Sequence, residues 1–124
     1  MTKKLVLFLS VALATLSFQA LAADKQIKDI KELAGNWQGW VTAEVGDERA
    51  TMIVQPDGSY KATTPRGTEA QGKFYLQQDG KLMYRSSRTA GKAILTEDGG
   101  KTTITILPED PTYRTGSARY ERVK

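Results

Sequence analysis

The sequence predicts an all-β protein, an eight-stranded antiparallel up-and-down meander barrel with a short N-terminal helical turn. Two observations favour this fold. From Asn36 onward, apolar and polar residues alternate in short runs, which is the pattern of strands with one buried face. Turns that contain Gly or Pro separate these runs down to the C-terminus. Closing eight such strands into a barrel removes the exposed edges. A two-sheet sandwich is the second choice and a five-stranded Greek-key barrel the third.

The first 22 residues have the pattern of a secretory signal peptide. Lys3 and Lys4 form a basic start, an apolar run covers residues 5–16, and Ala20-Leu21-Ala22 fits the small-x-small cleavage pattern. A membrane anchor is the alternative, although the run is short for a spanning helix. No Cys follows the expected cleavage site, which excludes a lipoprotein anchor. We therefore expect cleavage after Ala22 and a periplasmic protein, with full secretion as the second choice.

The composition of the remaining chain excludes several classes of catalytic and metal site. Cleavage leaves 16 of the 18 Lys and Arg residues and all 14 Asp and Glu residues, so the expected net charge is +2. That charge is too small to indicate nucleic-acid or membrane attraction. The chain has no Cys and no His, which excludes disulfides, thiol catalysis, His-based triads and the usual transition-metal sites. No carboxylate spacing indicates acid–base catalysis, so we expect neither an enzyme nor a metal or cofactor.

The elements follow in order from the cleavage site. Residues 23–34 are expected to form the helical turn, because Ile27, Ile30 and Leu33 recur every three residues and Gly35 follows them. The barrel domain then spans residues 35–124. Gly46-Asp47 and Pro56-Asp57-Gly58 are the first two expected turns. The eight expected strands cover residues 36–45, 48–55, 59–64, 68–77, 81–88, 92–97, 101–107 and 117–124.

The strand order separates the expected turns into two ends of the barrel. The Asp-Gly turns fall at the end that the helical turn covers. The opposite end carries the basic residues Arg49, Arg66, Arg88, Lys92 and Arg114. Acidic residues at the same end partly offset their charge, namely Asp47, Glu48, Glu109 and Asp110. These residues have two interpretations, either solvated turn residues or the rim of an open, Arg-bearing mouth.

Gly35-Asn36-Trp37, which follows the helical turn at the start of the first strand, resembles the Gly-x-Trp motif of the lipocalin and wider calycin barrels. The resemblance implies an Arg near the end of the last strand that packs across this Trp, and Arg122 holds that position. The chain departs from the usual lipocalin because it is shorter and lacks the disulfide and the C-terminal helix. Short strands also enclose little volume. We expect Gly35, Trp37 and Arg122 to be a structural motif that closes the barrel.

The expected function is the binding of a small apolar or anionic amphipathic molecule, such as a lipid-like ligand. An Arg-bearing mouth over an apolar interior suits such a molecule. Its candidate binding residues are Arg66, Arg88, Arg114, Tyr60, Tyr84 and Tyr120. The inner-face candidates for the ligand wall are favoured as plain core over ligand contact, and they are Val41, Met52, Tyr60, Phe74, Leu82, Tyr84, Ile104 and Tyr120.

A protein partner is the alternative function. Trp40 lies on the outward face of the first strand, either as a lone surface residue or as part of a partner-binding patch. Residues 84–92 resemble the Tyr…Thr-x-Gly loop of small periplasmic lysozyme inhibitors, although the cysteines of those proteins are missing here. This resemblance implies an inhibitor of a cell-wall hydrolase.

Overall fold

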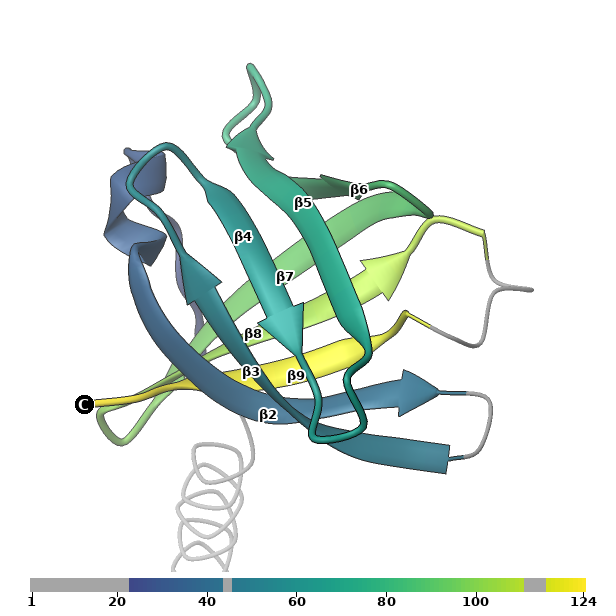
Figure 1. The fold of residues 1–124 in the computed structure, drawn as a ribbon. Helices are drawn as coiled ribbons and strands as arrows, with labels where there is room; N and C mark the ends of the chain where they lie inside the picture. Colours follow the sequence, from purple (N-terminus) through teal and green to yellow (C-terminus); the bar gives the residue numbers. More distant parts are fainter. Residues whose placement is uncertain (1–22, 44–45, 111–115) are drawn as a thin grey trace, which may run out of the picture.

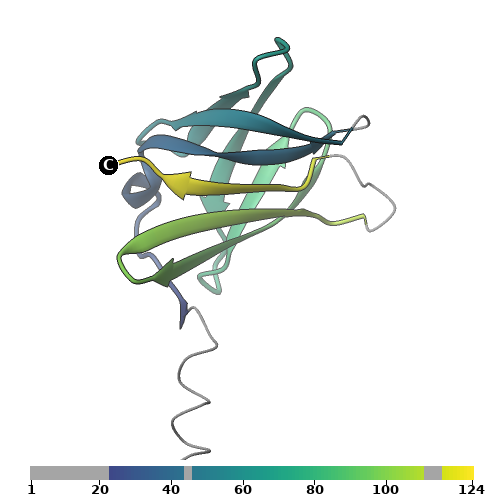
Figure 2. The same ribbon diagram turned by 90° about the horizontal axis from the view of Figure 1, so that it is seen from below.

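The computed structural model describes residues 23–43, 46–110 and 116–124, which form a closed antiparallel barrel of eight strands (Figures 1 and 2). Each barrel strand pairs with the next one along the chain, and the last pairs back with the first. The predicted up-and-down meander barrel is therefore confirmed. Its strands are β2 (Gly35–Ala43), β3 (Gly46–Val54), β4 (Ser59–Thr63), β5 (Glu69–Leu76), β6 (Leu82–Ser86), β7 (Ala90–Asp98), β8 (Lys101–Pro108) and β9 (Ala118–Arg122).

The first hairpin is tighter than the sequence suggested. Gly46 and Asp47 were expected to form a turn, but they pair with Ala43 and Thr42 and belong to β3. The positive φ of Gly46, 114°, lets the strand start directly opposite the end of β2. The connection itself, residues 44–45, lies outside the described residues.

The N-terminal segment closes one end of the barrel. The expected helical turn is present as the 3₁₀ turn η1 (Ile30–Leu33), in which Asp29 and Glu32 form a capping box. Leu33 of this turn and Ile27 before it are both buried. The preceding residues were wrongly expected to be helical, because β1 (Ala23–Asp24) pairs with Thr96 and Glu97 of β7. β6 pairs only with the first part of β7, at residues 90–92, and so leaves the far part of β7 free for β1.

The interior is filled unevenly along the barrel axis. Near η1 it contains large side chains that are at most 1% exposed, namely Leu33, Trp37, Met52, Phe74 and Ile104. Toward the opposite end, the inner face carries small residues instead, namely Ala50, Ala62, Ala70 and Ala118. We call these two regions the closed half and the mouth half. The strand parity that placed Met52, Phe74 and the three tyrosines inside is confirmed.

Candidate ligand-binding cavity

Trp37 and Arg122 connect the first and last barrel strands to η1 at the closed half. Trp37 is fully buried, and its Nε1 donates a hydrogen bond of 3.0 Å to the Leu33 carbonyl oxygen. The Arg122 guanidinium carbon lies 4.4 Å from the centre of the Trp37 ring. The same guanidinium donates to the carbonyl oxygens of Ala34 at 3.0 Å and Glu32 at 2.6 Å, at the end of η1. The expected stack of Arg122 on Trp37 is confirmed. The guanidinium of Arg122 also donates hydrogen bonds to carbonyl groups that a short turn leaves without partners.

Gly35 allows this close approach. It has a φ of 132°, a conformation that residues with a side chain rarely adopt. A Cβ at this position would lie 3.3 Å from the Arg122 Nη1 atom. The three motif residues therefore act together as one structural unit at the closed half.

A cavity of about 530 Å³ opens at the mouth half. It exists because the inward positions at this level carry Ala rather than Leu or Phe. Ala62 faces Ala70 directly across the β4–β5 pair, and Ala118 faces Val41 across the β2–β9 pair. Ala50, Ile106 and Ser86 contribute from three further strands. The cavity is larger than the short strands suggested, because small side chains leave the space open.

All three tyrosines predicted as site residues line this cavity. Tyr60 packs on Phe74 with ring centres 4.7 Å apart. Its hydroxyl lies over Gly72, where a Cβ would approach to 2.6 Å, so a side chain at residue 72 would displace the ring. The Tyr84 hydroxyl shares a hydrogen bond of 3.0 Å with the Thr89 hydroxyl. Tyr120, on β9, is 2% exposed.

Burial holds the three phenols in their neutral form. Desolvation, reinforced by the nearby Tyr84, raises the pKa of Tyr60 to about 12. Burial likewise raises the pKa of Tyr84 and of Tyr120. A phenol is uncharged at neutral pH even without burial, and here the raised pKa keeps it so at higher pH as well, which leaves a hydroxyl that can form a hydrogen bond inside the cavity.

The rim of the cavity carries charges of both signs. Arg66 and Arg88 line it as expected, but Arg66 lies 3.5 Å from the Glu48 carboxylate, whose side chain is only 11% exposed. The rim is therefore less cationic than the sequence suggested. Two other basic residues expected at this end, Arg49 and Lys92, are exposed and do not line the cavity. The remaining candidate, Arg114, lies outside the described residues.

The loop between β6 and β7 is held by local hydrogen bonds. The Ser86 hydroxyl accepts from the backbone N–H groups of Arg88 at 3.2 Å and Thr89 at 3.0 Å, and it donates to the Thr89 carbonyl at 3.0 Å. This arrangement is a local side chain–backbone turn. It leaves Ser87 and Arg88 exposed at the rim.

The sequence analysis missed the alanine walls and the inward carboxylate of Glu48. The signal for Glu48 was present, because it shares the parity of Ala50 and Met52 on the same strand. The signal for the walls was the series of Ala residues at inward positions. Recognising them as one cavity also required knowing which of these positions lie at the same level of the barrel.

Comparisons with family models, curated proteins and solved structures find no match to this chain. Over the described residues, no group of three or more His, Cys, Asp or Glu side chains could hold a metal ion. No helix among those residues is long and apolar enough to cross a membrane.

Proposed function

We propose that this barrel is an exported, non-enzymatic binding protein that holds a small apolar or anionic amphipathic molecule in its mouth half. The observation that carries the proposal is the cavity of about 530 Å³ inside a barrel whose other half is tightly filled. Sites for small molecules commonly measure about 300–1,000 Å³ and combine apolar walls with a few polar groups. The alanine walls and the three tyrosine hydroxyls match that description.

The arrangement of groups suggests how such a ligand would lie. Its apolar part packs against Val41, Ile106 and the alanines, which removes apolar surface from water. Its oxygen atoms accept hydrogen bonds from neutral tyrosines within the cavity or from the guanidinium groups of Arg66 and Arg88 at the rim. The anionic head of such a ligand competes with the Glu48 carboxylate for Arg66. Because the Glu48 charge repels further negative charges, the rim favours a ligand with a single negative charge over a polyanion.

Export to the periplasm and a place among the lipocalin-like or calycin barrels are parts of the same proposal. The pattern of residues 1–22 supports export. The eight-stranded barrel, the leading 3₁₀ turn and the Trp37–Arg122 stack support the family. A lipocalin-like fold fits the binding of a small molecule, but the function rests on the cavity.

Native mass spectrometry of the mature protein, purified gently from a periplasm, tests this function. We expect an adduct of lipid-like mass, or its uptake from a lipid extract. Ala62→Leu should weaken the adduct by narrowing the cavity, and Arg66→Gln with Arg88→Gln should weaken it as well. Gln71→Leu is the matched control, because Gln71 is exposed and does not line the cavity. A clean apo mass with no uptake would contradict the proposal.

A protein partner is the second candidate, for which the hydrogen-bonded β6–β7 loop with Ser87 and Arg88 exposed is the supporting observation. A loop whose conformation is fixed by hydrogen bonds before binding loses less conformational entropy on binding. Inhibition of a purified cell-wall hydrolase, abolished by Arg88→Ala and unaffected by Ala62→Leu, would favour this alternative over the small ligand.

A further inference from the structure

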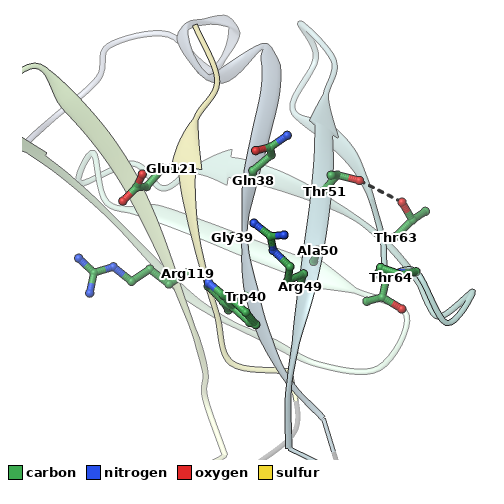
Figure 3. A pocket seen from close by; sticks show the side chains of 11 residues that line it. Gln38, Gly39, Trp40, Arg49, Ala50, Thr51, Thr63, Thr64, Arg119 and Glu121 are labelled. Carbon is green, nitrogen blue, oxygen red and sulfur yellow. Dashed lines mark hydrogen bonds between the residues drawn. The ribbon is translucent and has the colours of Figure 1, made fainter.

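A second concave site lies on the outside of the barrel (Figure 3). It is a groove of about 770 Å³ over the outer faces of β9, β2 and β3, extended by the end of β4. Its central residue, Trp40, is 53% exposed. We call this feature the outer groove. It shares the sheet with the inner cavity but faces the opposite way, so its function is independent of the one proposed above.

The register places charged groups on both sides of Trp40. Arg119 of β9 and Arg49 of β3 are its direct partners across the two strand pairs. The Arg49 guanidinium carbon lies 5.7 Å from the centre of the Trp40 ring. Among the described residues, no carboxylate forms an ion pair with either guanidinium. In the part of the chain that the structure describes, Arg49 and Arg119 thus both neighbour Trp40 in the register without an ion pair, although the Arg119 side chain extends away from the ring (Figure 3).

The neighbouring row of the groove is polar and uncharged except for one carboxylate. Gln38 lies between Thr51 of β3 and Glu121 of β9 in the register. The hydroxyls of Thr51 and Thr63 are 3.2 Å apart and hydrogen-bonded to each other, as Figure 3 shows. The row therefore offers amide, hydroxyl and carboxylate groups side by side, which both donate and accept hydrogen bonds.

We propose that the outer groove binds an acidic saccharide. A sugar ring has an apolar C–H face that can lie on the exposed indole, and its edge of hydroxyls both donates and accepts hydrogen bonds. Gln38, Thr51 and Glu121 offer complementary groups for that edge. A sugar carboxylate would pair with the guanidinium groups of Arg49 or Arg119, which fork toward carboxylates.

The same residues disfavour an acidic peptide. β2 is hydrogen-bonded to a strand on each side, so its backbone offers no edge at which a peptide could add as a further strand. The polar lining also differs from the apolar walls typical of sites for hydrophobic molecules.

Titration with a galacturonic acid hexamer, followed by tryptophan fluorescence and calorimetry, tests this site. We expect a saturable signal that Trp40→Ala abolishes and that Arg49→Gln with Arg119→Gln weakens by at least tenfold. Arg85→Gln is the matched control, because Arg85 lies 5.8 Å from the Tyr75 ring in a similar pair outside the groove. That control and Ala62→Leu should both bind the hexamer as the wild type does.

Three results would overturn the proposal. The first is no binding of the hexamer, or binding as tight to an uncharged glucose hexamer. The second is tighter binding of a polyglutamate peptide, which would make the groove a surface for acidic proteins. The third is a dimer of the wild type that Trp40→Ala dissociates, which would show that a second copy of the chain covers the groove.

Discussion

The closed half and the mouth half are built from the same strands, but their inward side chains differ in size. At the closed half, Trp37, Leu33 and Phe74 are fully buried, and Arg122 ties the last strand to η1. At the mouth half, the same inward pattern continues with alanines, and the interior stays open. A barrel of this length therefore separates stability from binding along its axis. Substitutions in the closed half should change folding, and those in the mouth half should change binding.

The largest effect is expected at Trp37. Trp37→Ala should lower the free energy of unfolding by about 3–5 kcal/mol, because it leaves a cavity and removes the hydrogen bond to Leu33. Trp40→Ala is the matched control, since its ring is 53% exposed and should matter by about 0.5 kcal/mol or less. Urea unfolding measures both variants. Similar losses at the two positions would contradict the assignment of stability to the closed half.

Arg122→Met should cost about 2–3 kcal/mol. The substitution removes two charge-assisted hydrogen bonds to η1 and the stack on Trp37, while it keeps much of the side-chain volume. Arg122→Lys should recover only part of this loss, because an ammonium group does not reproduce the planar fork. Unfolding in urea again provides the measurement. Full recovery with Lys would show that charge alone is sufficient at this position.

High pH tests the buried tyrosines that line the cavity. The pKa of Tyr60 is raised from 10.0 to about 12, so between these values the unfolded chain loses this proton before the folded chain does. Stability is fully present below pH 10 and should fall toward pH 12, by on the order of 2 kcal/mol from this group. Tyr60→Phe should remove the Tyr60 part of the decline in urea midpoints measured from pH 9 to 12 and leave the part that Tyr84 and Tyr120 contribute. An equally steep decline in this variant would place the titration elsewhere.

Much of the barrel was predictable from local pattern, because alternation and turn residues act within a few positions of each other. Parity alone placed Met52, Phe74 and Tyr120 inside the barrel. The cavity was less predictable, because it depends on which inward residues share a level. Ala62 and Ala70 face each other through the β4–β5 register, whereas Ala118 joins them only after β9 closes on β2.

The outer groove shows the same limit of sequence reasoning. Trp40 was recognisable as an aromatic residue on the polar face of its strand. Its guanidinium neighbours were not, because Arg49 and Arg119 come from strands far apart in sequence. Arg49 was instead expected at the mouth. The hydrogen-bonding register between strands, rather than the composition of any single strand, brings this site together.

A small expected effect on stability at Ala62 is the sharpest test of the comparison between the two halves. Ala62→Leu should change the free energy of unfolding by less than about 1 kcal/mol, because the added carbons enter open space. Ala93 is almost as buried as Ala62, 5% against 6% exposed, but it does not line the cavity, so overpacking by Ala93→Leu should cost about 1–3 kcal/mol. Urea unfolding compares the two variants directly. Equal costs would mean that the space beside Ala62 is as tightly filled as the core around Ala93, and the ligand proposal would lose its physical basis.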